Sequence, residues 1–378
     1  MTSAVTAEVT VGPTRVALLK DGRQTYPAML EAIARAQSTV CLETYVLRDD
    51  TTGLRFLHAL MDRARAGVEV LVMYDHWGSE LSTETLAHLR EAGVKVLGFR
   101  PVRLAGTAGR LLARLRRRNH RKSLIVDGEV GFTGGLNIAN DYADPAEGGG
   151  GWRDTHVRVV GPTALELEHL FLETWRRQKG PAYDRARFVR EAPANCARIR
   201  VVGNDFARGT KAIRREYTRA FTTARERVFL THAYFLPPAK MLKDLMGAAR
   251  RGVRVAVILA ATTDVKLVLW GARWLYPRLL RAGVEVWEWK EGRVLHAKTA
   301  VVDGTWSTVG SSNLDPLSLR QNLEVNAVIV DETFGQALEG LFVDDLARCE
   351  RVTTQTIASY GPLMRALSWL AFRSRRWM

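Results

Sequence analysis

The sequence predicts an α/β protein whose two similar halves share one site between them. A pattern of polar residues carries the repeat, because His120-x-Lys122-x4-Asp127-Gly128 recurs as His296-x-Lys298-x4-Asp303-Gly304. Helix-like segments alternate with short valine-rich strands throughout, which indicates a layered α/β architecture in each half. With 378 residues, each half is long enough to bury a core of its own.

Weaker matches extend the repeat around these motifs. Twice in each half, a glycine-valine step follows a helix-like segment and opens a strand. The matching segments are 45–47 with 234–236, 66–70 with 251–255, and 92–96 with 282–286. The boundary is expected in the Arg- and Pro-containing stretch before residue 200. We therefore divide the chain into an N-terminal half (1–190), a C-terminal half (191–350) and a basic amphipathic C-terminal segment (351–378).

The polar repeat falls on two predicted hairpins. The runs 122–126 and 298–302 are rich in β-forming residues and are closed by Asp-Gly, a strong signal for a tight turn. Because residues i and i+2 of a strand point to one face, the histidine and lysine of each copy project together. A single such strand reads as a half-exposed sheet edge. A structural hairpin gives no reason, however, for the same pair of side chains at the same two places twice.

A turn of small residues ending in an asparagine follows each hairpin at the same distance, as Gly134-Gly-Leu-Asn137 and Gly310-Ser-Ser-Asn313. Two histidines, two lysines and two amides suggest one composite pocket for a phosphodiester. Asp127 and Asp303 fall in the hairpin turns. We interpret them first as turn or supporting residues, with a direct catalytic role as the alternative.

Two further carboxylates are candidates for orienting the histidines. A catalytic imidazole needs a carboxylate or carbonyl on its second nitrogen to fix its tautomer and direction. Asp154, in Trp-Arg-Asp-Thr-His, and Glu324, in Asn-Leu-Glu-Val-Asn, supply one such group per half. Either could reach across the pseudo-twofold axis, so the sequence leaves open which histidine each one orients. The other histidines show no metal-ligand spacing, and no metal site is predicted.

Charge and amphipathic patterning favour a polyanionic partner. The 55 Lys and Arg against 40 Asp and Glu give a net charge of +15 and a pI near 10.1, which suits membranes and nucleic acids alike. A basic insert at 100–119 interleaves arginines with leucines, and it could hold anionic head groups or phosphates, or be a solvated helix. Tryptophans and aliphatic residues beside arginines at 363–377, and again at 265–276, suit a helix lying in a lipid interface, with a core helix as the alternative.

The sequence also bears on location. No stretch approaches the roughly 18 to 20 uninterrupted apolar residues that a spanning helix needs. The N-terminal stretch lacks the layout of a signal peptide, and three widely spaced cysteines imply no disulfide framework. We therefore expect a protein attached peripherally to the cell membrane, on its cytoplasmic side.

The paired motifs resemble the signature of the phospholipase D superfamily. Within it, segments 43–46, 119–128, 134–142, 151–157 and 310–326 look like the bacterial cardiolipin synthase branch, and the similarity covers roughly residues 15–350. It implies two pseudo-symmetric α-β-α sandwich halves with the active site at their interface. Longer cardiolipin synthases begin with membrane-spanning helices, so this sequence is similar to the shorter, helix-free members.

The resemblance also implies roles for the site residues. One histidine attacks phosphorus and the other protonates the leaving alkoxide, and the usual order in the family makes His120 the nucleophile and His296 the acid and base. Lysines and asparagines would stabilise the developing charge as preorganised donors, without a cofactor. The implied catalytic set is His120, Lys122, Asp127, His296, Lys298 and Asp303, and the implied phosphate-binding set is Lys122, Asn137, Lys298 and Asn313.

The leading hypothesis is a phosphatidyltransferase that makes cardiolipin and glycerol from two phosphatidylglycerols through a phosphohistidine. Its expected partners are the anionic phospholipid substrate and a membrane surface. A hydrolytic phospholipase D is the alternative. A nuclease is a further one, although no aromatic platform is interleaved with the basic insert and no nucleic-acid partner is expected. Intact paired motifs argue against a non-catalytic membrane module. The oligomeric state stays open, since one chain carries both motifs.

Overall fold

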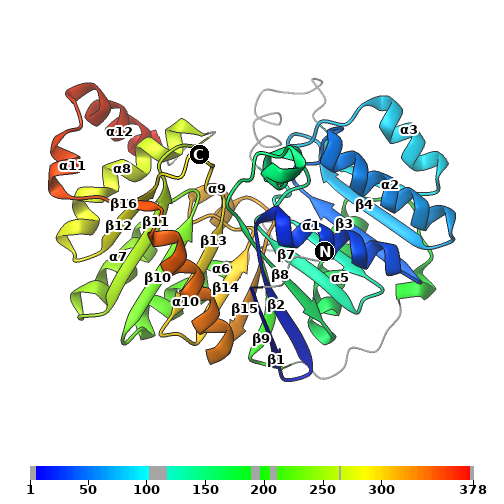
Figure 1. Cartoon of the computed structure of the whole chain (residues 1–378), viewed down its shortest axis with the longest axis horizontal. Coiled ribbons are helices and arrows are strands. Elements are labelled where there is room, and N and C mark those ends of the chain that lie inside the picture. The colour runs from blue at the N-terminus through cyan, green and yellow to red at the C-terminus, as the bar shows by residue number, and fades with distance from the viewer. Residues whose placement is uncertain (1–5, 102–116, 189–195, 205–210, 264, 375–378) are drawn as a thin grey trace.

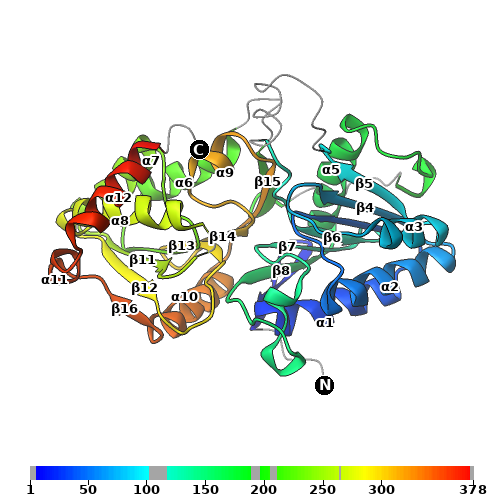
Figure 2. The same cartoon turned by 90° about the horizontal axis from the view of Figure 1, so that it is seen from above.

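The computed structural model describes residues 6–101, 117–188, 196–204, 211–263 and 265–374. They form two eight-stranded mixed sheets, one in each half, with helices around and between them (Figure 1 and Figure 2). The first sheet has the order β1-β2-β8-β7-β6-β3-β4-β5, and the second has the order β9-β15-β14-β13-β10-β11-β12-β16.

The first half contains strands β1 (Ala7–Val11), β2 (Thr14–Lys20), β3 (Thr39–Thr44), β4 (Glu69–Asp75), β5 (Lys95–Phe99), β6 (Ser123–Val126), β7 (Val130–Gly134) and β8 (Thr155–Val160). Its helices are α1 (Asp21–Arg35), α2 (Thr51–Arg65), α3 (Thr83–Glu91) and α5 (Pro162–Arg177), with short 3-10 turns η1 (Asn140–Tyr142), η2 (Pro145–Glu147) and η3 (Arg185–Phe188).

The second half contains strands β9 (Ile199–Asn204), β10 (Arg227–His232), β11 (Arg254–Ala260), β12 (Glu285–Trp289), β13 (Lys298–Val302), β14 (Trp306–Gly310), β15 (Glu324–Val330) and β16 (Cys349–Arg351). Its helices are α6 (Ala212–Thr223), α7 (Ala239–Arg250), α8 (Lys266–Arg281), α9 (Pro316–Arg320), α10 (Glu332–Leu346), α11 (Thr354–Ala358) and α12 (Pro362–Ser374).

The sheets confirm the predicted repeat. Read from β2 to β5 and from β9 to β12, the two strand orders match neighbour for neighbour. The strands β3, β4 and β5 are parallel, as are their counterparts β10, β11 and β12, and the other pairs are antiparallel. The predicted glycine-valine steps stand directly before β4, β5, β11 and β12.

The two Asp-Gly turns are as expected from the sequence. Asp127 and Gly128 have φ angles of 53° and 61°, and Asp303 and Gly304 have φ angles of 51° and 65°. Positive φ at both central positions suits the right-handed twist of a tight hairpin, and glycine reaches it at no steric cost. These turns join β6 to β7 and β13 to β14, and each hairpin belongs to one copy of the polar motif.

Three hydrophobic clusters hold the layers together. One lies under α1, α2 and α3 on one face of the first sheet, and a second lies under α6, α7 and α8 of the second half. The third joins the halves, because it combines Ile125 and Val159 with Val301 and Val325 and with the apolar faces of α5 and α10. Each half is therefore an α-β-α sandwich, and α5 and α10 also contact the other half, at β9 and at β1 and β2.

The expected divisions of the chain can be placed on this fold. Residue 190 falls in the connection between α5, the last long helix of the first half, and β9, the first strand of the second sheet. Residues 349–351 form β16, which pairs with β12, and α12 packs on α8, so the C-terminal segment adjoins the second half. Most of the basic insert, 102–116, lies outside the described residues. Within the described residues, no helix is both long and apolar enough to span a bilayer.

Candidate active site

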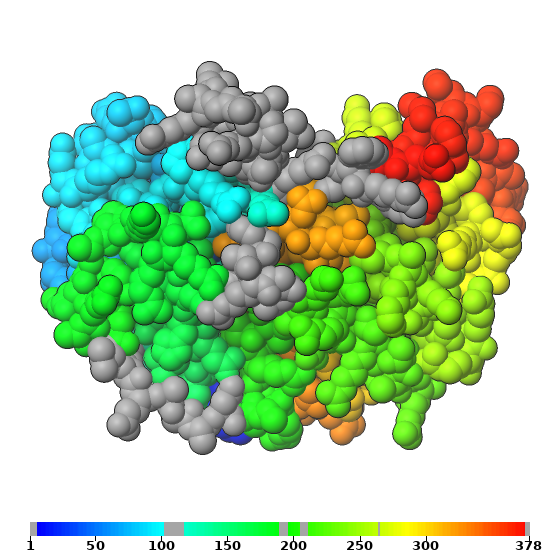
Figure 3. Space-filling view, turned by 180° about the vertical axis from the view of Figure 1, so that it is seen from behind, coloured from blue at the N-terminus to red at the C-terminus, as the bar shows by residue number. Residues whose placement is uncertain are grey.

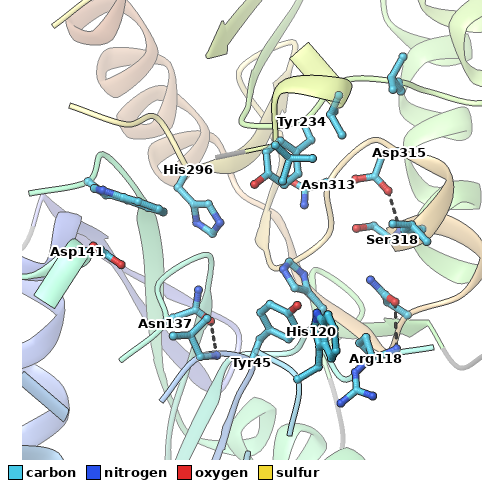
Figure 4. Close-up of a pocket in the computed structure, with 18 of the residues that line it drawn as sticks. Tyr45, Arg118, His120, Asn137, Asp141, Tyr234, His296, Asn313, Asp315 and Ser318 are labelled. Atoms are coloured by element: carbon cyan, nitrogen blue, oxygen red, sulfur yellow. Dashed lines mark hydrogen bonds between the residues drawn. The ribbon is translucent and has the colours of Figure 1, made fainter. Parts of the chain in front are cut away.

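A cavity of about 350 Å³ lies between the halves. Matching residues of the repeat line it from both sides: His120 and His296, Asn137 and Asn313, and Tyr45 and Tyr234. Tyr45 follows β3 and Tyr234 follows soon after β10, so the cavity stands at the carboxyl ends of parallel strands, where ligands of α/β proteins commonly bind. Figure 4 shows the labelled side chains converging on it, and Figure 3 shows α9 (orange) at the surface where the halves meet.

Backbone pairing places each histidine. The amide of His120 donates to the carbonyl of Leu323 at 2.9 Å, and the amide of His296 donates to the carbonyl of Arg153 at 2.8 Å. These two partners directly precede Glu324 and Asp154, the predicted orienting carboxylates. The backbone that precedes each histidine therefore pairs with the segment of the other half that carries a carboxylate.

The side chains repeat this crossing. Nδ1 of His120 forms a hydrogen bond of 3.1 Å with Oε2 of Glu324, and Nδ1 of His296 forms one of 2.7 Å with Oδ2 of Asp154. Each carboxylate contacts the histidine of the opposite half, which is the pairing that the sequence left open. With Nδ1 held in this way, Nε2 is the ring nitrogen left for the cavity, and Figure 4 shows the two imidazoles entering it from opposite halves.

Electrostatics makes the two pairs unequal. Burial and the nearby charge of Lys298 lower the pKa of His296 to about 4, although Asp154 acts against this. Burial alone would raise the pKa of Asp154, but Lys298 and the hydrogen bond with His296 lower it to about 2. Burial also lowers the pKa of His120, while Glu324 opposes the shift. At neutral pH, His296 is therefore a neutral imidazole beside an ionised Asp154, and Nζ of Lys298 lies 2.9 Å from the same Nδ1.

The two motif lysines lie behind the histidines. Nζ of Lys122 donates to the carbonyl of His120 at 2.7 Å, and Nζ of Lys298 donates to the carbonyl of His296. Both are buried, and neither is among the residues that line the cavity. Burial and the charge of Lys298 lower the pKa of Lys122 to about 7, although Glu324 acts against the shift. Direct phosphate contact by the lysines stays a prediction.

The two asparagines line the cavity with different partners. Oδ1 of Asn137 accepts from the amide of Val46 at 3.1 Å, and its Nδ2 donates to the hydroxyl of Tyr142 at 2.7 Å. Oδ1 of Asn313 is buried and has no hydrogen-bond partner among the described residues. Both side chains line the cavity, and their contact with a phosphodiester stays a prediction.

The motif aspartates serve the turns. Asp127 accepts hydrogen bonds of 2.7–2.8 Å from the backbone amides of residues 37–39, and Asp303 accepts bonds of 2.8–2.9 Å from those of residues 225–227. Each carboxylate thus ties its hairpin to the start of the neighbouring strand. Neither lines the cavity, so their positions fit the supporting role that we expected first and not a direct catalytic one.

The structure adds residues that the sequence analysis missed. Nδ1 of His156 accepts from the amide of Leu136 at 3.3 Å, and Oδ1 of Asn326 accepts from the amide of Ser312 at 3.3 Å. Each acceptor stands two residues after an orienting carboxylate and fixes the turn that carries an asparagine of the cavity. The sequence offered one signal for these residues, because an acceptor follows each carboxylate at the same spacing, in Asp-x-His and in Glu-x-Asn. The match is hard to see because the two acceptors are different residue types.

Aromatic rings complete the walls. The ring of Tyr45 lies 5.0 Å from that of His120 in a T-shaped contact, and the rings of Tyr142 and Trp152 lie 5.3 and 5.7 Å from that of His296. Such contacts restrict the imidazoles to the orientation that the carboxylates select. Across the described ranges, no group of His, Cys, Asp and Glu side chains is arranged to hold a metal ion.

The comparisons with known proteins agree with this geometry. A family model described as "Cardiolipin synthase, PLD-like domain" matches residues 29–146 and 217–346. The chain is 38% identical over 352 residues to cardiolipin synthase B of Salmonella typhi, covering 89% of this chain and 82% of that protein. It is 34% identical over 337 residues to a cardiolipin synthase of Geobacillus thermodenitrificans, covering 88% of this chain and 66% of that protein.

Solved structures share the fold. A phosphatidylserine synthase of Haemophilus influenzae superposes with a TM-score of 0.72 at 13% identity, covering 96% of this chain and 93% of that one. A polyphosphate kinase of Porphyromonas gingivalis superposes with a TM-score of 0.60 at 14% identity, covering 53% of its own chain. At these identities the likeness concerns the fold alone.

Proposed function

The chain belongs to the cardiolipin synthase family of phospholipase D-like proteins, and on that premise we propose that it condenses two phosphatidylglycerols into cardiolipin and glycerol through a phosphohistidine. The observation that carries the proposal is the 38% identity to cardiolipin synthase B over 89% of the chain, together with two carboxylate-oriented histidines that face one cavity. The chain is an enzyme of the phosphatidyltransferase type.

In the first step, Nε2 of the nucleophilic histidine attacks the phosphorus of a donor phosphatidylglycerol. The bond between phosphorus and the head-group oxygen breaks, and the second histidine gives its Nε2 proton to the departing glycerol. We assign His120 as the nucleophile and His296 as the acid. Asn137, Asn313 and the two lysines stabilise the charge that develops on the phosphoryl oxygens, as preorganised donors of a buried site do.

In the second step, a head-group hydroxyl of another phosphatidylglycerol replaces the glycerol. His296, now neutral, removes the hydroxyl proton, the oxygen attacks phosphorus, and the bond between phosphorus and His120 breaks. The products are cardiolipin and a free His120, so the atoms balance over the two steps. Water in place of the lipid alcohol would give phosphatidic acid, which is the hydrolytic alternative.

The role of His296 as the acid requires a change in its charge state. An acid must carry a proton, yet burial and the charge of Lys298 lower the pKa of His296 to about 4. A bound phosphodiester anion favours the imidazolium, so the acid form is gained with substrate and is absent without it. The two histidines titrate together with that anion, and their apparent pKa values belong to the pair.

The membrane is the proposed setting of the reaction. The relatives point to membrane-associated lipid metabolism, and both substrates are lipids. We assign the chain a peripheral position on the cytoplasmic side of the cell membrane, with anionic phospholipid as substrate and no nucleic-acid partner. No cofactor enters either step.

The test is product analysis by lipid mass spectrometry. Purified protein is incubated with phosphatidylglycerol in mixed detergent micelles and with a chelator, beside His120→Ala and His296→Ala. Cardiolipin and glycerol from the unmodified chain alone support the proposal. Phosphatidic acid as the sole product would assign hydrolysis, and lack of any turnover would contradict both.

A second donor assigns the histidines. A phosphatidyl ester of p-nitrophenol has a leaving group that needs no proton. We expect His296→Ala to release at most one equivalent of nitrophenolate and to retain a phosphatidyl group on His120, while His120→Ala releases none. The reverse pattern would make His296 the nucleophile.

A further inference from the structure

Most of the exposed large apolar side chains that the structure describes lie on α8, on α12 and on two loops, and two of these residues, Trp77 and Val265, also line the cavity. Among the described residues, seven of the nine large apolar side chains that are exposed lie on the loop after β4, at the start of α8 and along it, or on α12. They are Trp77, Val265, Leu267, Trp274, Leu363, Trp369 and Leu370. Single exposed apolar residues are common on soluble proteins, but a concentration of them marks an interaction site.

The helix α12 shows why this surface needs a partner. One of its faces packs on α8, where the rings of Phe372 and Trp274 are 6.5 Å apart, and Ser368 and Ala371 are buried. The opposite face leaves Leu363 and Leu370 exposed to 73% and 54%. A helix that is apolar on both faces is normally buried on both. The face of α12 that is exposed to water is therefore expected to contact a further apolar partner. We call the exposed apolar side chains of α8 and α12, with Val265, the α8–α12 ridge.

The ridge continues into the wall of the cavity. Val265 is 39% exposed and also lines the cavity, and Trp77 does the same from the other half at 58% exposure. These residues follow β4 and β11, which are counterparts in the two sheets. Figure 1 shows α8 and α12 in the second half, across the molecule from α3, which follows the Trp77 loop in the first half, and Figure 3 shows α12 (red) at the surface of the second half.

The charges on the ridge are of one sign. Neither α8 nor α12 contains an acidic residue, and both contain arginines. The guanidinium of Arg373 lies 5.7 Å from the ring centre of Trp369, so a cation and an indole stand together on the exposed side of α12. Tryptophan and arginine beside aliphatic residues suit the head-group level of a bilayer that contains anionic lipids.

We propose that the α8–α12 ridge inserts into the interface of an anionic lipid bilayer and brings the cavity to the level of the lipid head groups. The inference rests on the proposed function, since it states how that site reaches its lipids. Insertion of the ridge places Val265 and the nearby cavity wall beside the phosphodiesters of the membrane. A lipid head group can then enter the cavity while its acyl chains stay in the bilayer.

The experiment compares vesicle binding of a variant within the ridge with that of a variant outside it. Leu363→Ser with Leu370→Ser removes two side chains of the ridge. Val343→Ser is the control for loss of an exposed apolar side chain elsewhere, because Val343 is 56% exposed on α10, away from the ridge. Flotation with phosphatidylglycerol-phosphatidylcholine vesicles and with phosphatidylcholine vesicles, at low and high salt, gives the partition coefficients.

We expect the double variant to bind the anionic vesicles at least about tenfold more weakly than the unmodified chain, and Val343→Ser to bind within about twofold of it. Weaker binding of the unmodified chain to neutral vesicles, and at high salt, is expected as well. Binding of the double variant that equals that of the unmodified chain would overturn the proposal. A dimer that the double substitution dissociates without loss of vesicle binding would also overturn it, and would assign the ridge to contact between copies.

Activity in detergent micelles separates this inference from the proposed function. Micelles deliver the lipid without a bilayer, so the double variant should make cardiolipin there within about twofold of the unmodified rate and lose turnover on vesicles. Normal micellar activity with unchanged vesicle binding refutes the ridge alone. Ridge-dependent binding with no product in micelles refutes the proposed reaction alone.

Discussion

At the scale of single residues, the chemistry depends on how each imidazole is held. His296 and Asp154 form the closer pair, at 2.7 Å, and Asp154 keeps an ionised carboxylate with a pKa of about 2. In the proposed reaction, the carboxylate would fix the tautomer that presents Nε2 to the cavity and would stabilise the imidazolium that forms during turnover. These functions need an anion and not only a hydrogen-bond acceptor.

We therefore expect Asp154→Asn to lower kcat for cardiolipin formation by up to about 10⁴-fold, the loss seen when the aspartate of a Ser-His-Asp triad becomes an amide. The amide keeps the size of the side chain but loses its charge. Steady-state kinetics in micelles measures the effect, with the thermal midpoint as a control for folding. Activity within threefold of the unmodified chain would show that Asp154 does not orient His296.

Lys122 gives a prediction for pH. Its pKa of about 7 in the folded chain is below the ordinary value of 10.5, so between these values the unfolded chain binds more protons. The contribution of this residue to the free energy of unfolding therefore rises as pH increases from about 7. It is smallest where the folded lysine is fully charged.

Urea unfolding of the unmodified chain and of Lys122→Met, from about pH 7.5 to 9.5, tests this. The difference between their free energies of unfolding should shift in favour of the unmodified chain, by up to about 1.4 kcal/mol per pH unit. A difference that is independent of pH would mean that Lys122 keeps an ordinary pKa.

At the scale of the elements, the turns after β7 and β14 accommodate a buried carboxylate in two different ways. A Cβ on Gly135 would lie 2.1 Å from Oδ1 of Asp154, so only glycine leaves room for that carboxylate. The counterpart, Ser311, instead donates its hydroxyl to Glu324. One turn makes space for its carboxylate and the other binds it, which explains why the small-residue turns differ in composition.

Gly135→Ala should therefore displace Asp154 and reduce kcat by about 10²-fold, because small misplacements at a reacting centre cost about that much. Gly340→Ala is the matched control, since a Cβ there, in α10, meets nothing within 4 Å. That helix position should gain about 0.5–1 kcal/mol and keep full activity. Full activity of Gly135→Ala would contradict the close approach.

Elements were predictable where the signal is local. The Asp-Gly turns and the glycine-valine strand starts depend on residues within a few positions, and the structure confirms them. The pairing of Glu324 with His120 joins residues 204 apart, and only the packing of the halves decides it. The sequence also could not show that Lys122 and Lys298 lie behind the histidines. The alternation of side chains along a strand predicts which face a residue is on, but not how far its side chain lies from the cavity.

At the scale of the whole molecule, buried ion pairs fix the two halves to each other. The guanidinium of Arg153, in the first half, lies 2.7 Å from Asp345 of α10 in the second half, and both side chains are at most 2% exposed. The carbonyl of Arg153 also accepts from the amide of His296. The same residue thus joins the halves and holds the backbone of His296, the proposed acid.

Asp345→Asn should destabilise the chain by about 3–5 kcal/mol, because it leaves the buried charge of Arg153 with less compensation. Asp62→Asn removes an exposed partner of Arg65 and should cost at most about 1 kcal/mol. Equilibrium unfolding in urea compares the two. Similar losses from both substitutions would mean that the contact between the halves adds little to stability.

The crossed pairing of histidines and carboxylates also has a consequence for synthesis. His120 leaves the ribosome long before Glu324, and Asp154 long before His296. A nascent chain can complete the first sheet, but its imidazole then has no carboxylate to direct it. On the proposed reaction, a product that stops anywhere before Glu324 should be inert toward lipid, because His120 then lacks its carboxylate. Activity should therefore appear only late in translation, after both carboxylates and both histidines have been made.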